Sequence, residues 1–245
     1  MSRSASSSSR PCCPIDGALR LSEPLGAEAE RGIEALIDLL RTDPTAPVAK
    51  STLATARDVH VADSLSGLEF EQLRESERIA DLGSGAGFPG LVLALALVQI
   101  RCDLIESSSR KCEFLRRAIE RAGAGNAEVV CERAETWAAG EGREAYDAVT
   151  ARAVGRLATL AELASPLLRD GGVLVAWKGG RDRDEESELE RSAPRLAIEP
   201  VEIRSVTPFH GSRDRHIHLL RKNGPTPDGL PRREGLAAKR PFGSE

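Results

Sequence analysis

The sequence predicts an α/β fold with a doubly wound, mainly parallel sheet. Between residues 78 and 196, short apolar segments of strand length alternate with longer segments whose apolar residues repeat at helical spacing. A glycine-rich turn at 81–90 joins the first expected strand to its helix. Strands that alternate with helices are joined by crossovers, which give parallel strands covered on both faces. The ligand of such a sheet is expected at the carboxyl ends of its strands.

Local patterns justify the elements in order. The apolar lead Arg78-Ile79-Ala80 enters the glycine turn, and an apolar run follows it. Residues 110–122 are amphipathic, with Phe114 and Leu115 on one face. The turn Asp170-Gly171-Gly172 precedes another strand. The expected strands are 78–82, 101–106, 127–132, 146–152 and 173–177, and the expected helices are 87–98, 110–122, 157–168 and 185–196. Two late strands, 201–207 and 216–220, predict an antiparallel edge hairpin that turns near Gly211-Ser212.

The flanking segments differ in composition from this core. The first residues are rich in serine and poor in apolar side chains, which predicts a disordered tail. Helical spacing at 25–40, with a shorter helix at 57–64, predicts an N-terminal helical appendage. Proline, glycine and arginine dominate the end of the chain. The expected division is a disordered tail (1–20), the helical appendage (21–70), the sheet domain (71–222) and a basic, extended C-terminal tail (223–245).

Composition limits the possible classes of protein. The five cysteines are odd in number and form no Cys-x-x-Cys pair, so we expect no disulfide framework and no metal site. Reduced cysteines favour a cytoplasmic protein. No apolar run approaches the ~20 residues that span a bilayer, so we expect no membrane association. Nothing in the sequence demands a dimer, and we expect a monomer.

The turn Asp81-Leu82-Gly83-Ser84-Gly85-Ala86-Gly87-Phe88-Pro89-Gly90 fits two ligands. Its last six residues match the dinucleotide pattern G-x-G-x-x-G. Asp81, however, opposes a pyrophosphate and suits the ammonium group of S-adenosylmethionine. A turn that binds nothing is the third alternative. Glu106 ends the second strand, where a carboxylate can accept both ribose hydroxyls of either ligand. Ala134-Glu135 follows the third strand and either flanks an adenine or forms a plain surface loop.

Several segments in order resemble one known family. They are Arg57–Leu65 with its His-x-x-Asp-Ser pattern, Ile79–Gly90 with its Pro-Gly ending, Asp103–Leu115, Tyr146–Ala153, Trp177-Lys178-Gly179, and the tail Leu230-Pro231-Arg232-Arg233 with Lys239-Arg240-Pro241. From about Asp58 to its end, the chain resembles the RsmG (GidB) family of small-subunit ribosomal RNA guanine-N7 methyltransferases. The Trp-Asn-x-x-x-Asn-Leu-Thr stretch usual in that family has no counterpart in Ile37–Ala56, which holds neither tryptophan nor asparagine.

The resemblance implies a Rossmann-like class I methyltransferase that uses S-adenosylmethionine and acts on 16S ribosomal RNA or the small ribosomal subunit. By resemblance, the residues that bind the cofactor are Gly83, Phe88, Ala134, Glu135 and Arg152. The chemistry of the residues adds Asp81, Gly85 and Glu106.

Guanine N7 carries no proton, so its methylation needs no general base, and catalysis should come mostly from placing N7 in line with the methyl group. Arg152, Lys178 and His60 are the candidate catalytic residues. Arginine reads guanine well, but N7 must stay free, so O6 or a phosphate is the expected contact of Arg152. Each of the three also has a structural alternative, as an ion-pair partner or a packed histidine.

Basic residues late in the chain form a candidate RNA-facing patch, although the net charge of the whole chain is −4. They are Arg213, Arg215, Arg221, Lys222, Arg232, Arg233, Lys239 and Arg240. A solvated tail is the alternative interpretation. Other functions stay open: a methyltransferase acting on another RNA, a protein or a small molecule, or a non-catalytic nucleotide-binding or NAD-binding protein.

Overall fold

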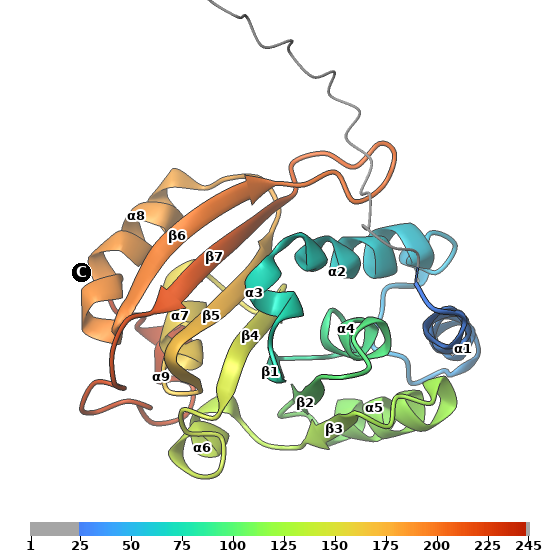
Figure 1. Cartoon of the computed structure of the whole chain (residues 1–245), viewed down its shortest axis with the longest axis horizontal. Helices are drawn as coiled ribbons and strands as arrows, with labels where there is room; N and C mark the ends of the chain where they lie inside the picture. The colour runs from blue at the N-terminus through green and yellow to red at the C-terminus, as the bar shows by residue number, and fades with distance from the viewer. Residues whose placement is uncertain (1–24, 244–245) are drawn as a thin grey trace, which may run out of the picture.

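A computed structural model describes residues 25–243, which form one seven-stranded sheet in the order β3-β2-β1-β4-β5-β7-β6 (Figure 1). The first five strands are parallel, and β7 and β6 pair antiparallel at one edge. The predicted fold class is confirmed. The strands are β1 (Arg78–Leu82), β2 (Arg101–Ile105), β3 (Ala127–Val130), β4 (Tyr146–Arg152), β5 (Leu168–Lys178), β6 (Ile198–Ser205) and β7 (His216–Lys222).

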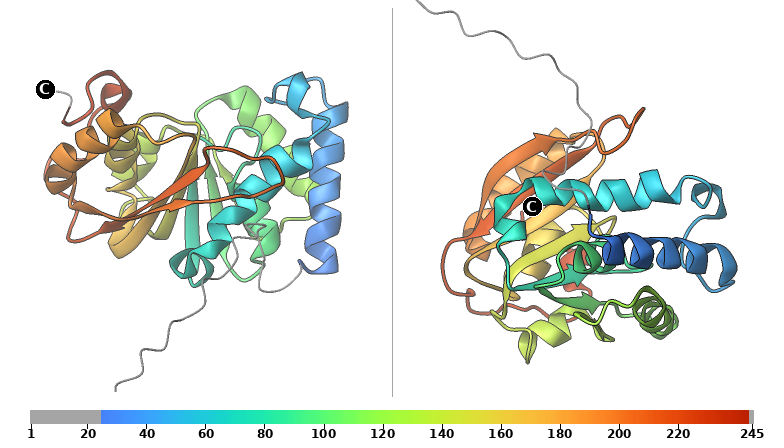
Figure 2. Two further views of the ribbon diagram at one scale, coloured as in Figure 1. Left: turned by 90° about the horizontal axis from the view of Figure 1, so that it is seen from above. Right: turned by 45° about the vertical axis from the view of Figure 1, so that its right-hand side comes forward.

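Helices cover both faces of the sheet (Figures 1 and 2). One face carries α1 (Ala27–Thr42), α2 (Asp63–Leu65), α3 (Glu71–Arg74), α4 (Gly90–Ala96) and α5 (Ser109–Ala122). The other carries α6 (Ala134–Ala139), α7 (Leu157–Ala164), α8 (Arg183–Ser192) and α9 (Leu236–Lys239). A π-helix, Arg57–Ala62, leads directly into α2. No helix within residues 25–243 is both long and apolar enough to cross a membrane.

The period of two along the strands divides the core between the two faces. Ile79 of β1 belongs to the apolar cluster that includes residues of α1, α4 and α5, whereas Ala80 and Leu82 belong to the cluster that includes residues of α7 and α8. Close approach fixes α1, because a Cβ at Gly32 would lie 2.6 Å from a Leu95 methyl carbon and 2.7 Å from the Ala122 carbonyl oxygen. The apolar face of α1 therefore belongs to the core that it shares with the sheet.

Apart from β1 and β4, the elements differ from their expected bounds by one to five residues, and the expected helix 157–168 ends at Ala164 because Leu168 already begins β5. Two further differences have a clear cause. α4 begins at Gly90 instead of residue 87, because the preceding glycines hold a non-helical turn. The residues Asp170-Gly171-Gly172, expected as a turn before a strand, lie inside the continuous strand β5. The register between β4 and β5 shifts after Tyr146, which accommodates this segment as an irregularity of the sheet.

The expectation of reduced cysteines fails at one pair, because Cys112 and Cys131 form a disulfide between α5 and the end of β3. The spacing of the two residues gave no signal, since the packing of α5 against β3 brings them together. Among the described residues, Cys102 is the one free cysteine, and it is buried.

The segment after Asn223 folds back on the domain and is not extended. Two nitrogens of the Arg232 guanidinium, Nε and Nη2, donate to the buried carboxylate of Glu162 on α7, each at 2.5 Å. The Arg232 guanidinium also lies 4.0 Å from the centre of the Phe242 ring. A buried carboxylate on α7 therefore holds a segment whose composition alone predicts no fold. The expected disordered tail, 1–20, lies outside the described residues.

Candidate functional site

The glycine loop after β1 takes a conformation suited to glycine. Gly83, Gly85 and Gly87 have φ angles of 65°, 56° and 94°, in the region where a side chain is strained. The N–H groups of Gly83 and Ser84 donate to the Ile105 carbonyl at 2.9 and 3.2 Å, which ties the loop to the end of β2. The loop therefore presents bare backbone at the carboxyl edge of the sheet.

Asp81 lies beneath this loop and is fully buried. Its Oδ2 accepts from the Gly90 N–H at 3.1 Å, and its Oδ1 accepts from the Thr150 hydroxyl at 2.8 Å. Burial raises the pKa of Asp81 to about 6, although these hydrogen bonds act in the opposite direction. The sequence predicted that this carboxylate would meet an ammonium group. In the structure it holds the start of α4 against the sheet and lines neither cavity described below.

Glu106 ends β2 with its carboxylate held in place by backbone. Oε2 accepts from the Gly85 N–H at 3.2 Å, Oε1 accepts from the Ser108 N–H at 2.9 Å, and the Lys111 ammonium lies 3.6 Å away. Only 5 % of the residue is exposed, and it lines a cavity. A fixed carboxylate at this position can accept hydrogen bonds from a diol.

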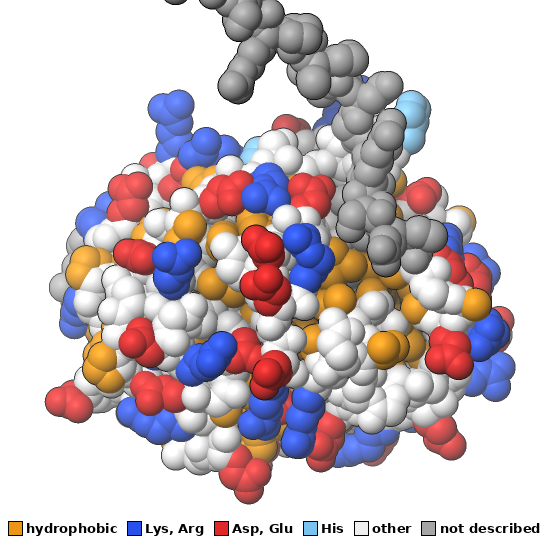
Figure 3. Space-filling view, in the orientation of Figure 1, with side chains coloured by type: hydrophobic (Ala, Val, Ile, Leu, Met, Phe, Trp, Pro, Cys, Tyr) orange, Lys and Arg blue, Asp and Glu red, His pale blue; other side chains and the backbone are white. Residues whose placement is uncertain are grey.

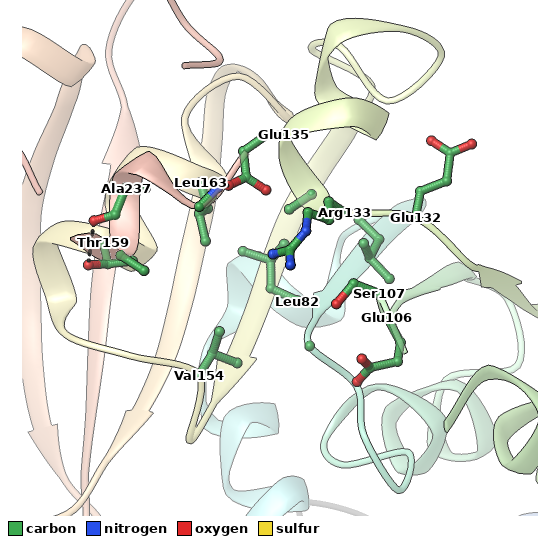
Figure 4. A pocket seen from close by; sticks show the side chains of 15 residues that line it. Leu82, Glu106, Ser107, Glu132, Arg133, Glu135, Val154, Thr159, Leu163 and Ala237 are labelled. Carbon is green, nitrogen blue, oxygen red and sulfur yellow. Dashed lines mark hydrogen bonds between the residues drawn. The ribbon is translucent and has the colours of Figure 1, made fainter. Parts of the chain in front are cut away.

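That cavity, of about 200 Å³, opens at the carboxyl ends of β1, β2 and β3 (Figure 4). We call it the adenosyl cavity, after the ligand that the sequence predicts for this edge of the sheet. The predicted residues that it brings together are Gly83, Glu106, Ala134 and Glu135. Sequence reasoning missed Thr159 and Leu163 of α7, which line this cavity, and two further walls. One is Val154, on the loop after β4, and the other is the C-terminal segment, through Gly235, Ala237 and Ala238.

The Glu135 side chain holds the C-terminal wall of the adenosyl cavity. Its Oε1 accepts from the Gly235 N–H at 2.7 Å. Beside this pair, the hydroxyl of Thr136, the residue after Glu135, donates to Glu234, the residue before Gly235, at 2.6 Å. The predicted contact between Glu135 and the ligand therefore competes with a structural contact, and the sequence holds no local signal for a pairing across 100 residues.

Gly85 lies in the loop outside the adenosyl cavity, and Phe88 and Arg152 join His60 in a separate cluster. The His60 ring stacks on Phe88 with centroids 4.9 Å apart, and the Arg152 guanidinium lies 5.2 Å from the same ring. Arg152 Nη1 donates to Asp63 Oδ2 at 2.9 Å. Burial, and next the positive charge of Arg152, lower the pKa of His60 to about 4. The imidazole is therefore neutral at neutral pH.

Lys178, at the end of β5, is engaged on both sides of its ammonium group. Nζ donates to Glu185 Oε1 at 2.6 Å and to the Gly155 carbonyl at 3.0 Å. The same carboxylate oxygen accepts from the Leu157 N–H at 2.7 Å. Lys178 therefore fixes the loop between β4 and α7, which supports the structural alternative for this residue.

A second cavity, of about 170 Å³, lies between α2, the ends of β4 and β5, and the β6–β7 loop. Its lining includes Asp63, Arg152, Trp177, Lys178 and Arg215. Ala153 lines this cavity and Val154 lines the adenosyl cavity, so the loop after β4 is a wall of both. Residues 25–243 contain no group of three or more His, Cys, Asp or Glu side chains that could hold a metal ion.

A glycine loop after β1, a carboxylate at the end of β2 and an antiparallel β7 beside β5 define the class of an S-adenosylmethionine-dependent methyltransferase. The chain belongs to the GidB family, rRNA small subunit methyltransferase G, whose model matches residues 48–218. It is 37 % identical to the ribosomal RNA small subunit methyltransferase G of Thermotoga neapolitana, over 88 % of this chain and 92 % of that one. It is 42 % identical to the protein of the same name from Rubrobacter xylanophilus, over 75 % and 72 % of the two chains.

Solved structures share the fold. An S-adenosylmethionine-dependent O-methyltransferase from Thermotoga maritima aligns with a TM-score of 0.53 and 16 % identity, over 77 % of this chain and 71 % of that chain. Fibrillarin from Aeropyrum pernix, solved with S-adenosylmethionine, aligns with a TM-score of 0.51 and 19 % identity, over 65 % and 72 %. The predicted Rossmann-like methyltransferase fold is therefore confirmed.

Proposed function

We propose that this enzyme transfers the methyl group of S-adenosylmethionine to N7 of a guanine in 16S ribosomal RNA. Membership of the GidB family supports the choice of substrate, and one structural observation supports the chemistry. A cavity suited to an adenosyl group and a second, positively charged cavity share the loop after β4 as a wall.

The residues of the adenosyl cavity fit the cofactor chemically. The Glu106 carboxylate is fixed by two backbone N–H groups and would accept from the ribose hydroxyls. Gly83, which has no side chain to block the approach of a ligand, and Ala134 would line the nucleoside. When bound, S-adenosylmethionine supplies an electrophilic methyl group on a sulfonium centre.

Catalysis then requires positioning more than proton transfer. Guanine N7 attacks with a lone pair, and no proton leaves before attack. Neutral His60 packs on Phe88, and the pairs Arg152–Asp63 and Lys178–Glu185 fix the elements around the second cavity. Rigid walls of this kind hold the two reactants in line, which is the larger part of the rate enhancement expected for this reaction.

A substrate in the small ribosomal subunit supports the proposal that the enzyme works in the cytoplasm, and we propose that it does so as a monomer. Exposed basic residues late in the chain would supply the phosphate contacts that RNA binding requires.

The test is methyl transfer from labelled S-adenosylmethionine to 30S subunits that lack the modification. Label should enter 16S RNA, and reduction followed by aniline should cleave the RNA at one N7-methylguanosine. Label at another atom or in protein would contradict the proposal. Calorimetry separates the cofactors: we expect binding of S-adenosylmethionine and none of NAD.

A further inference from the structure

Arg215, at the foot of the β6–β7 loop, is a charged side chain of the second cavity without a partner. Its Nε is buried and makes no hydrogen bond, and among the described residues its guanidinium forms no ion pair. The other two cations of this cavity are paired, Arg152 with Asp63 and Lys178 with Glu185. Buried donors in folded proteins almost always have acceptors. An acceptor for Arg215 is therefore expected from a ligand.

The second cavity also offers an acceptor of its own. Asp63 is 4 % exposed, and its Oδ2 accepts from Arg152. No donor among the described residues reaches its Oδ1. The lining thus combines a guanidinium that lacks an acceptor with a carboxylate oxygen that lacks a donor. A ligand complementary to both must present an acceptor and a donor along one edge.

We propose that the second cavity binds the target guanine base, with Arg215 donating to O6 and Asp63 accepting from N1–H and the 2-amino group. The proposal rests on the proposed function and adds to it the residues that choose the base. Guanine O6 lies between N7 and N1, so these contacts occupy the Watson–Crick edge and leave N7 open to attack. Adenine has an amino group in place of O6 and an acceptor at N1, so it mismatches both residues.

The size and position of the cavity agree with a single base. Its volume of about 170 Å³ is below the ~300–1,000 Å³ of pockets for drug-sized ligands and suits one planar ring system. Enzymes that modify a base bring it out of its stack into such a pocket. The shared loop, Ala153 to Gly155, separates this cavity from the adenosyl cavity by one segment of backbone.

The first test follows the NMR signals of the indole N–H groups of the two tryptophans, with the protein saturated with S-adenosylhomocysteine. Trp177 lines the second cavity, whereas Trp137 donates to the Tyr146 hydroxyl elsewhere. Guanosine 5′-monophosphate should shift the Trp177 signal and leave Trp137 unchanged. Adenosine 5′-monophosphate and ribose 5-phosphate should shift neither. An equal shift by ribose 5-phosphate would assign Arg215 to a phosphate and overturn the proposal.

Matched variants test the residue itself. Arg215→Gln should lose the Trp177 shift, and Arg213→Gln, two residues away on the same loop and exposed, should keep it. An unshifted Trp137 signal in both variants shows that the fold is intact. With 30S subunits, Arg215→Gln should lower kcat/KM for RNA by roughly 10- to 100-fold at unchanged affinity for S-adenosylmethionine. On 30S subunits the comparison is with the wild type, and wild-type activity of Arg215→Gln would refute the assignment. Failure of the wild-type protein to methylate guanine N7 would refute the proposed function instead, because nucleotide binding is measured independently.

Discussion

Several carboxylates at the edge of this sheet accept hydrogen bonds from backbone N–H groups, so their role is structural as well as a candidate role in ligand binding. Asp81 accepts from the Gly90 N–H, Glu135 from the Gly235 N–H, and Glu185 from the Leu157 N–H. Each bond joins segments that lie apart in the sequence, and each fixes a wall of one of the two cavities or the start of α4. An acid beside a ligand-binding loop is therefore not by itself a ligand contact, and the position of its oxygens decides its role.

Asp81 gives the first prediction. Its folded pKa of about 6 exceeds the ordinary value of 3.8, so the unfolded chain loses this proton first as the pH rises. The group therefore lowers the free energy of unfolding between about pH 4 and pH 6, by roughly 3 kcal/mol. Asp81→Asn cannot ionise, and its amide oxygen can still accept from Gly90. From pH 4 to pH 7 in urea unfolding, the variant should gain about that much stability relative to the wild type. Parallel pH curves would contradict the pKa.

His60 gives the second prediction. A general base contributes ~10²- to 10⁴-fold to a rate, so its removal should cost that much if N7 attack depended on it. His60→Phe keeps a ring to stack on Phe88 and removes both nitrogens. Because N7 carries no proton, single-turnover methyl transfer by this variant should stay within about tenfold of the wild type. His60→Ala, which also removes the stack, is the comparison, and it should be slower than His60→Phe. A loss of 10²-fold or more in His60→Phe would make the imidazole a participant in the chemistry.

At the scale of elements, the periodicity of apolar residues predicted those bounds of strands and helices that local sequence determines. The strands β1 and β4 have the predicted bounds, because alternating or continuous apolar residues end at a glycine turn or a charged residue. The start of α4 and the continuity of β5 were missed, because positive-φ glycines and strand pairing control them. In the site, a strand end predicted Glu106 and the family resemblance predicted Gly83 and Ala134, and the three line the same cavity. Arg215 and the C-terminal wall were not assigned there, because pairings across the fold leave no local pattern.

The C-terminal wall makes the third prediction. If Glu135 holds Gly235 over the adenosyl cavity, Glu135→Ala frees that segment and should weaken binding of S-adenosylmethionine by about tenfold, the value of a lost hydrogen bond to a charged group. Glu135→Gln keeps an acceptor oxygen and should bind close to the wild type. Calorimetry with S-adenosylmethionine measures both. Equal loss in the two variants would instead indicate that the negative charge contacts the cofactor.

For the whole molecule, charge is distributed rather than concentrated. On the face seen in Figure 3, Lys and Arg side chains are interspersed with Asp and Glu. Two members of the predicted basic patch are structural. Lys222 is fully buried and donates to the Ser165 and Leu168 carbonyls, and Arg232 is paired with Glu162. These two cannot serve as phosphate contacts, whereas Arg213, Arg233, Lys239 and Arg240 are exposed. RNA binding should therefore depend on fewer cations than the composition of the late segment suggests.

Charge reversal at two adjacent arginines, Arg232 and Arg233, should separate an effect on stability from an effect on RNA binding. Arg232→Glu places a second carboxylate against Glu162, of which 2 % is exposed, and should destabilise the fold by about 3–5 kcal/mol, as does breaking other buried pairs. Arg233→Glu changes an exposed side chain and should leave the unfolding midpoint close to that of the wild type. If Arg233 meets a phosphate, its reversal should weaken binding to 16S RNA and reduce the slope of log K against log salt by about 1. Urea unfolding and filter binding from 50 to 200 mM salt measure the two effects. An unchanged slope in Arg233→Glu would remove Arg233 from the RNA interface.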